Sequence, residues 1–133
     1  GKAKKVIEGS SLSVITYGMG VVWMQEFLKN NSEYDGLIEV IDLRSLLPWD
    51  KDMVFSSIKK TNKVIILNED NITGSISAEI SAVISEHLFE YLDAPILRLG
   101  SIDTPIPFSS NIEKNIYLPI NKINSAVKKL LEY

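Results

Sequence analysis

The stretch from Glu39 to Asp50, Glu-Val-Ile-Asp-Leu-Arg-Ser-Leu-Leu-Pro-Trp-Asp, limits the possible folds more than any other part of the chain. Its first apolar residues are β-branched, which predicts the end of a buried strand that starts near Leu37. Pro48 can continue neither a strand nor a helix interior, so the chain must turn there. Asp50 can cap a following helix, because its carboxylate accepts free N–H groups of the first turn. The stretch therefore predicts one βα unit.

Two opposite charges, Asp42 and Arg44, follow this strand at its carboxyl end. In open α/β sheets that edge is where loops meet ligands or partners. We interpret the pair as a structural corner in which a carboxylate or backbone carbonyls hold the Arg44 guanidinium. The planar fork of arginine suits such a bidentate contact better than lysine does.

The rest of the chain alternates between strand and helix patterns. Apolar and β-branched runs predict further strands at residues 6–7, 12–17, 63–68 and 96–99. Helical spacing predicts helices after residue 20, over about 51–60, from about 77, and over about 122–131. The continuous run from Val64 to Leu67 is typical of a central parallel strand covered on both faces. The first two strands, joined by a short turn, would be antiparallel if they paired.

The segment from Gly100 to Pro119 is expected to be mostly irregular, since it holds Pro105 and Pro107 as well. A loop of this length in a compact domain is usually functional or held against something. It carries four apolar residues that should not be left in water together, so we expect it to cover part of the sheet or a neighbouring subunit. These residues are Ile106, Phe108, Ile112 and Ile116.

Gly18-Met19-Gly20 lies between a predicted strand and a predicted helix, as a dinucleotide-binding fingerprint would. The third glycine of that motif should be residue 23, which is Trp23. An indole there blocks the close packing of helix on strand that the motif needs. We therefore interpret the glycines as a tight turn, although an anion could still be held weakly at the helix start.

The loop from Glu69 to Ser75 follows the central strand and contains adjacent carboxylates, Glu69 and Asp70. Two neighbouring acids without a third ligand make a weak metal or acid–base site. We expect instead that the loop and the start of the next helix pack against another subunit. Small and hydroxyl residues allow close approach there, and two isoleucines supply apolar area. The expected interface residues are Glu69, Ile72, Thr73, Gly74, Ser75 and Ile76.

The composition excludes several classes of protein. A net charge of −3 argues against nucleic acid or an anionic membrane as the main partner. The absence of cysteine removes disulfides, zinc–thiolate sites and cysteine nucleophiles, and fits a cytoplasmic protein. The single histidine, His87, makes neither a triad nor a metal site, and we expect it to be packed or at an interface. The 133 residues fit one domain, 1–133, and the start at Gly1 suggests a piece excised from a longer polypeptide.

Several motifs, taken in order along the chain, resemble the C-terminal domain of the β-subunit of the thiamine-dependent decarboxylating component of 2-oxo acid dehydrogenases. That domain is of the transketolase C-terminal type. Three positions depart from the family pattern: Asn68 stands for a usual histidine, Ser75 for a glycine and Ile76 for a phenylalanine. The matching motifs are Gly1-Lys2-Ala3, Glu8-Gly9-Ser10, Tyr17-Gly18, the stretch from Glu39 to Asp50, Glu69, Thr73-Gly74, Glu79-Ile80, Ala94-Pro95, Arg98, Asp103-Thr104-Pro105, Pro107 and Leu118-Pro119.

The resemblance implies a three-layer α/β/α domain on a five-stranded mixed sheet with the first strand antiparallel. In the family, thiamine diphosphate and magnesium sit between the α-subunit and the preceding domain of the β-subunit. This domain would therefore hold no catalytic residue, cofactor or metal of its own. The parent enzyme would oxidatively decarboxylate a 2-oxo acid and transfer the acyl group to a lipoyl group.

The resemblance also implies partners. They are the α-subunit, a second β-subunit or fused equivalents of these, and the dihydrolipoyl acyltransferase core. Family likeness places docking of the acyltransferase core at Glu132 and Tyr133. If Tyr133 is the native end, its terminal carboxylate and the carboxylate of Glu132 would attract arginines.

Two alternatives stay open at this point. The chain could come from a transketolase or a deoxyxylulose-phosphate synthase, or it could be a free-standing binding module. The segments Asp103-Thr104-Pro105 and Leu118-Pro119 favour the dehydrogenase. A pyrimidine-binding domain encoded upstream of Gly1 would distinguish an enzyme part from a free-standing module.

Overall fold

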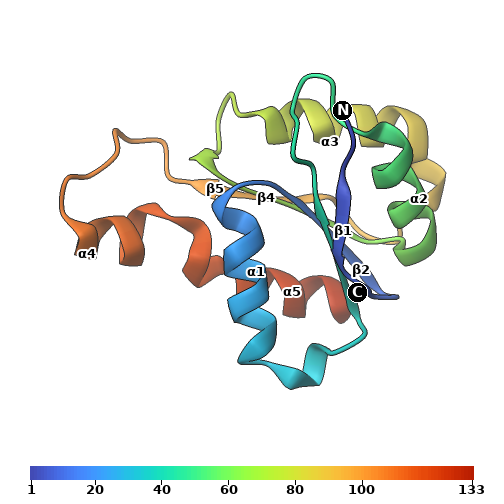
Figure 1. Cartoon of the computed structure of the whole chain (residues 1–133), viewed down its shortest axis with the longest axis horizontal. Helices are drawn as coiled ribbons and strands as arrows, with labels where there is room; N and C mark the ends of the chain where they lie inside the picture. The colour runs from blue at the N-terminus through green and yellow to red at the C-terminus, as the bar shows by residue number, and fades with distance from the viewer.

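Five strands form one mixed sheet at the centre of the computed structural model, which describes all 133 residues (Figure 1). Their order across the sheet is β1-β3-β2-β4-β5. β1 runs antiparallel to β3, and every other pair is parallel. The expected five-stranded mixed sheet with an antiparallel first strand is confirmed. The strands are β1 (Lys4–Ile7), β2 (Leu12–Thr16), β3 (Ile38–Asp42), β4 (Val64–Asn71) and β5 (Leu97–Ser101).

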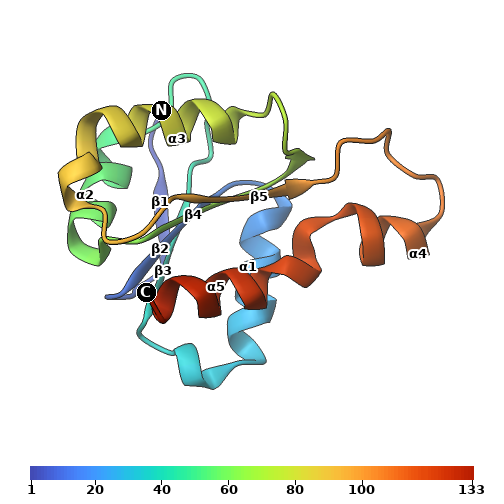
Figure 2. The ribbon, with the colours of Figure 1, turned by 180° about the vertical axis from the view of Figure 1, so that it is seen from behind.

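Helices cover both faces of the sheet, which completes the expected three layers (Figure 1 and Figure 2). One face carries α1 (Met19–Lys29) and α5 (Ile123–Leu131). The opposite face carries α2 (Lys51–Thr61) and α3 (Ile76–Leu88). The short helices are η1 (Ser32–Tyr34), η2 (Phe89–Tyr91), α4 (Ser110–Ile112), η3 (Glu113–Tyr117) and η4 (Pro119–Lys122).

The hydrophobic core is split in two by the sheet. On β2, Leu12 and Val14 pack toward α1 and α5, whereas Ile15 packs toward α2 and α3. All five residues of β2 are buried, because the strand has a paired neighbour on each side and helices on both faces. The strand therefore contributes to both cores at once.

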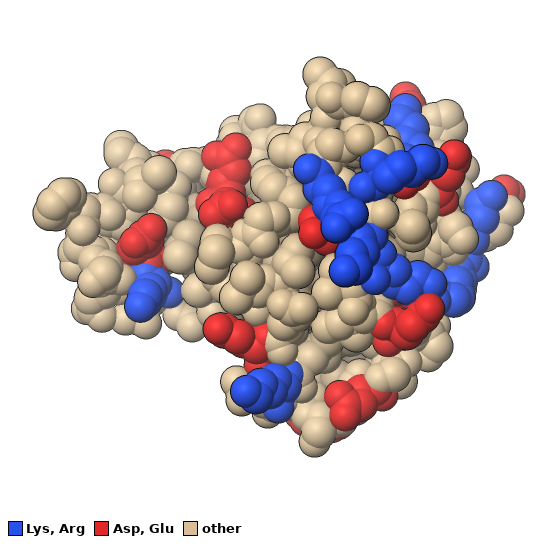
Figure 3. All heavy atoms as spheres, in the orientation of Figure 1, with Lys and Arg blue, Asp and Glu red and all other residues tan.

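Buried polar side chains join the sheet to α2. The Ser13 hydroxyl lies 2.6 Å from the Ser57 hydroxyl and 2.6 Å from that of Thr61, so none of these buried groups lacks a partner. Glu39 of β3 is also buried and forms ion pairs with Lys5 of β1 and Lys60 of α2. Figure 3 shows lysine and arginine side chains gathered over β1 and the neighbouring helix.

Asp50 caps α2, as expected. Its Oδ1 accepts the Met53 N–H at 3.1 Å, and its Oδ2 accepts the Ala3 N–H at 3.0 Å. These two donors, the Ala3 N–H first, hold the pKa of the Asp50 carboxyl below its usual value. The cap therefore also fastens the segment that precedes β1 to the start of α2.

β5 leads into a projecting segment, residues 102–117, which we call the arm (Figure 1). A hydrogen bond of 3.2 Å from the Ile102 N–H to the Tyr117 carbonyl closes its base. The expectation of a mostly irregular segment was wrong in part, because α4 and η3 lie within the arm. Their helical turns satisfy backbone groups locally, which apolar periodicity in so short a segment does not reveal.

None of the helices combines the length and the apolar composition that a membrane-spanning helix requires.

Gly9, in the turn between β1 and β2, packs directly against the backbone of β3, and this close packing can be tested. A Cβ atom at Gly9 would overlap the backbone of Ile38, whereas one at Gly1 would meet Pro48 at an ordinary 3.8 Å. We expect Gly9→Ala to lower the free energy of unfolding by about 1–3 kcal/mol, because backbone of β3 must move. Chemical denaturation measures this, with Gly1→Ala as the matched control. Equal midpoints for the two variants would contradict the close packing of Gly9 on β3.

Candidate functional site

The carboxyl ends of the four parallel strands lie at one edge of the sheet. The chain passes from β2 to β3 on one side and then crosses to β4 on the other side of β2. The loops that follow β2 and β4 therefore diverge at this edge, which is where open α/β sheets bind ligands or partners. The turn at Gly18 meets Glu69 there. The loop was expected to begin at Glu69, but β4 continues to Asn71, because Asn71 still pairs with Ser101 of β5, so the loop begins at Ile72.

The glycine turn does not fit a diphosphate. Gly18 has a φ of 56°, and an Oε1 of Glu69 lies 2.7 Å from where its Cβ would be. A carboxylate therefore occupies the space beside the start of α1 and would repel an anion. Trp23, which stands where a dinucleotide motif needs its third glycine, is buried in the core on this face of the sheet. Nowhere do three His, Cys, Asp or Glu residues group to hold a metal ion. The residues present do not fit thiamine diphosphate with magnesium.

The six residues expected at a subunit interface do not all face outward. Glu69, Thr73 and Gly74 are exposed, and Ile72 is half-buried. Ser75 is buried, with its hydroxyl 2.6 Å from that of Ser77, so its side chain completes the interior rather than an interface.

Ile76, the last of the six, is half-buried and packs on the core between α2, α3 and the sheet. The apolar area of this loop is therefore smaller than the sequence suggested.

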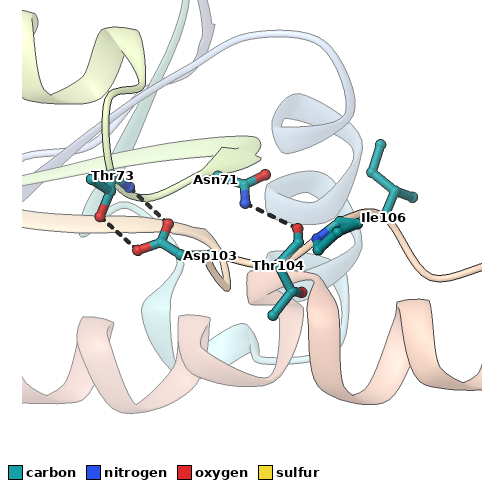
Figure 4. A pocket seen from close by; sticks show the side chains of 6 residues that line it. Asn71, Thr73, Asp103, Thr104 and Ile106 are labelled. Atoms are coloured by element: carbon teal, nitrogen blue, oxygen red, sulfur yellow. Dashed lines mark hydrogen bonds between the residues drawn. The ribbon is translucent and has the colours of Figure 1, made fainter.

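Thr73 joins this loop to the arm. Its hydroxyl donates to Asp103 Oδ2 at 2.6 Å, and its backbone N–H donates to Asp103 Oδ1 at 3.0 Å (Figure 4). The hydroxyl, then the N–H, hold the pKa of the Asp103 carboxyl below its usual value, and the charge of Arg98 acts in the same direction. Arg98 itself donates to the Ile72 carbonyl at 3.0 Å. Loop and arm are thus joined by charge-assisted hydrogen bonds.

Asn71, the last residue of β4, makes a second connection to the arm. Its Nδ2 donates to the carbonyls of Ile102 at 3.0 Å and Thr104 at 3.1 Å, and its Oδ1 accepts the Tyr117 hydroxyl at 3.0 Å. The sequence pattern did not single out Asn71, because an asparagine after two acids is typical of any polar loop. Between loop and arm lies an open hollow of about 550 Å³, lined by Asn71, Thr73, Asp103, Thr104, Pro105 and Ile106 (Figure 4).

The arm exposes apolar side chains. Ile106 is 72% exposed, Ile116 is 58% exposed, and Phe108 is fully exposed. From Thr104 to Ile112 the chain carries no charged residue. The expectation that the arm covers part of this sheet is wrong for these side chains, because the arm projects beyond the edge. A contiguous uncharged segment with exposed apolar side chains is typical of a surface that another protein covers.

A second hollow, of about 630 Å³, lies between α1 and the end of the arm. Met19 and Val22 of α1 line it and are 45% and 39% exposed. Glu69 and Glu113 also line it, so the hollow has apolar walls with carboxylates among them. The arm residues that line this hollow, Glu113, Lys114 and Asn115, are polar or charged, so its apolar walls come from α1 and from residues after the arm.

The corner at Asp42 and Arg44 differs from the expectation. The Arg44 guanidinium is exposed and makes no hydrogen bond or ion pair within the chain. Instead, Asp42 Oδ1 accepts the backbone N–H of Arg44 at 3.1 Å, and Arg44 has a φ of 61°. The corner turns through its backbone, so the side chain of Arg44 is free for a partner rather than held by this domain.

The C-terminal residues lie at a different part of the surface, where β5 begins. Glu132 is exposed and Tyr133 is 64% exposed. Tyr133 lines a hollow of about 530 Å³ together with Phe89, which is 77% exposed, and Pro95. His87 is exposed too, with its ring 5.6 Å from that of Phe55.

Residues 1–123 match the protein family described as Transketolase, C-terminal domain. The chain belongs to the transketolase C-terminal domain family. It is 38% identical to the 2-oxoisovalerate dehydrogenase subunit beta of Bacillus subtilis over 135 aligned residues, which cover 100% of this chain and 41% of that protein. This transketolase C-terminal domain thus spans about two fifths of the length of the curated relatives it matches.

Other relatives carry related names. The pyruvate dehydrogenase E1 component subunit beta of Cyanidium caldarium is 38% identical, over 99% of this chain and 40% of its own length. The acetoin:2,6-dichlorophenolindophenol oxidoreductase subunit beta of Bacillus subtilis is 40% identical, over 98% of this chain and 38% of its own length. Among solved structures, a split-gene transketolase described as an inactive beta4 tetramer matches with a TM-score of 0.79 at 23% identity, over 98% of this chain and 41% of that one. This likeness supports the transketolase C-terminal fold.

The contact between Thr73 and Asp103 predicts a measurable titration. Because the pKa of Asp103 is lowered in the folded chain, the contact stabilises the fold above the unfolded pKa of about 4. That contribution is lost as the pH falls through the folded pKa. Thr73→Val removes the hydroxyl donor, so the pKa of Asp103 should rise toward its usual value. NMR titration of the carboxyl measures this.

Thr104→Val is the matched control, since Thr104 is exposed and its hydroxyl makes no hydrogen bond to Asp103. An Asp103 pKa that is equal in the parent chain and in the Thr73 variant would show that the hydroxyl does not act on this carboxyl.

Proposed function

We propose that this chain is a non-catalytic assembly domain of a thiamine-dependent 2-oxo acid dehydrogenase. The observation that carries the proposal is the arm, whose stretch from Thr104 to Ile112 is uncharged and exposes apolar side chains. The arm is fastened to the end of β4 and the loop after it, yet its own domain leaves these side chains uncovered. Relatives at 38% identity are named as beta subunits of such enzymes. The parent enzyme would decarboxylate a 2-oxo acid and transfer the acyl group to a lipoyl group.

The chemistry of the parent enzyme would take place outside this domain. Thiamine diphosphate with magnesium would be bound there and would supply the carbanion-stabilising chemistry of the reaction. The glycine turn filled by Glu69 supports this assignment, because that site cannot hold a diphosphate. In this proposal the domain contributes positioning of subunits, and a cysteine-free composition fits a cytoplasmic enzyme.

The partners in this proposal are an α-subunit and a second β-subunit, or fused equivalents. The interface centres on Ile106 and Phe108 of the arm and extends to Thr73 and Gly74 of the loop. The side chain of Arg44 and that of Glu69, both exposed at the same edge, are suited to its polar rim. Ile76 packs on the core beneath the loop, and the buried Ser75 fixes the loop through the hydrogen bond between its hydroxyl and that of Ser77. Ile72 is half-buried and adds apolar area at the edge of the proposed interface.

Phe108→Ser tests the assembly surface in the full-length parent enzyme. Phe108 is fully exposed in this chain, so the variant should fold normally. The buried aromatic would be lost from the interface, which we expect to weaken subunit association by about 2 kcal/mol, or some 30-fold in dissociation constant. Sedimentation velocity over a dilution series measures this.

Phe89→Ser is the matched control, because Phe89 is an equally large exposed ring at the far end of α3. The control should leave the subunits associated. Normal sedimentation of both variants, or loss of assembly in the control alone, would remove the arm from the proposed interface.

Docking of the acyltransferase core is the second part of the proposal and involves Glu132 and Tyr133. The exposed Tyr133 ring and Phe89 flank the hollow beside Pro95, which provides apolar contact area away from the arm. The exposed Glu132 carboxylate can attract arginines of a basic docking domain. Assembly and docking thus use separate surfaces in this account.

Glu132→Gln and Tyr133→Ala should each weaken binding of the acyltransferase docking domain to the assembled enzyme, by roughly 5- to 30-fold. Calorimetric titration measures the affinity, and higher salt should weaken binding of the parent more than that of Glu132→Gln, since charge attraction is screened. Glu33→Gln, an exposed acid in η1, is the control. Affinity that is indifferent to both substitutions and to salt means that docking occurs elsewhere.

A further inference from the structure

Asn71 holds both ends of the arm with one side chain. It is the last residue of β4, and its backbone is paired with Ser101 at the end of β5. Its amide N–H groups reach the carbonyls of Ile102 and Thr104, where the arm begins. Its amide oxygen accepts the hydroxyl of Tyr117, where the arm ends. The start and the end of the arm are thus joined to the central sheet through a single amide.

From this geometry we infer that Asn71 is a positioning residue, which fixes the arm in its binding orientation before any partner arrives. This inference rests on the proposed assembly function and adds how the arm is held in its binding conformation before association. The arm has few other attachments. The Ile102–Tyr117 backbone hydrogen bond closes its base, Thr73 holds Asp103, and the Asn121 amide donates to the Asn115 carbonyl. Ile106 and Phe108, being exposed, have little packing to hold them.

A preformed arm has an energetic consequence. A mobile arm would lose backbone and side-chain entropy on binding, and that loss would reduce the affinity for its partner. Tyr117 is 4% exposed, so its hydroxyl needs a partner in the interior, and Asn71 provides it. The same bond that satisfies this buried hydroxyl therefore keeps the arm ordered.

The chemistry of the side chain at position 71 is specific. An amide can donate to two carbonyls and accept a hydroxyl at the same time. An aspartate of the same shape still accepts the Tyr117 hydroxyl, but it donates nothing and places charge against the carbonyls of Ile102 and Thr104. Asn71→Asp thus tests the two donated hydrogen bonds without a change in volume. Tyr117→Phe tests the accepted bond alone.

The first experiment measures amide hydrogen exchange by NMR in this 133-residue chain. The N–H groups of Ile102 and Leu118 are hydrogen-bonded at the base of the arm. We expect Asn71→Asp to speed their exchange by about tenfold or more, with β2 unchanged, because local opening becomes easier. Asn124→Asp is the matched control, since Asn124 is exposed on α5. Unchanged exchange at the arm would overturn the inference.

The second experiment measures subunit association of the parent enzyme that carries Asn71→Asp. We expect the dissociation constant to rise about tenfold while Asn124→Asp has no effect. A loosened arm with normal association supports the positioning role in the chain but overturns the assembly function proposed for the arm. If Asn71→Asp does not fold, Tyr117→Phe decides: faster exchange confined to the arm supports the inference, and unchanged exchange overturns it.

Discussion

The burial of β2 between two paired strands and two helical layers is the constraint on which the rest of the structure depends. Its side chains enter both halves of the core, and Ser13 adds a hydrogen-bonded link to α2. Because β3 and β4 lie on opposite sides of it, the chain must diverge at its carboxyl end. That divergence creates the edge at which the loop after β4 and the arm after β5 meet.

The edge differs from a cofactor site in its chemistry. Where a nucleotide-binding fold would present free N–H groups to a phosphate, the Glu69 carboxylate lies beside Gly18. A catalytic site would also have a cavity lined by catalytic groups, whereas this edge carries the arm, whose Phe108 side chain lies in solvent. The polar side chains of this edge, such as Asn71 and Asp103, form hydrogen bonds within the domain and fasten the arm to it. We propose that the edge serves recognition between proteins.

Much of this fold could be predicted from the sequence, because its signals are local. The run from Val64 to Leu67 identified β4 as an inner parallel strand, and Asp50 identified the start of α2. The pairing of β1 with β3 rather than with its neighbour in sequence could not be predicted by the same means, because it depends on strands about 30 residues apart. The family resemblance, in contrast, implied the correct sheet.

The candidate site was less predictable than the fold. The loop at Glu69 could be singled out from its position at a strand end. Whether Ser75 pointed inward, or whether Arg44 found a partner, depended on tertiary contacts that no local pattern records. Asn71 is the clearest example, since its three partners lie more than 30 residues away.

The central claim is that a partner subunit covers the arm in the assembled enzyme. Hydroxyl-radical footprinting of Phe108 tests it most directly, because this ring is fully exposed in the chain alone. The account predicts that oxidation of Phe108 falls strongly when the parent enzyme is assembled without its acyltransferase core, while oxidation of the exposed Phe89 does not change. Equal oxidation of Phe108 in the free chain and in the assembled enzyme would contradict the account.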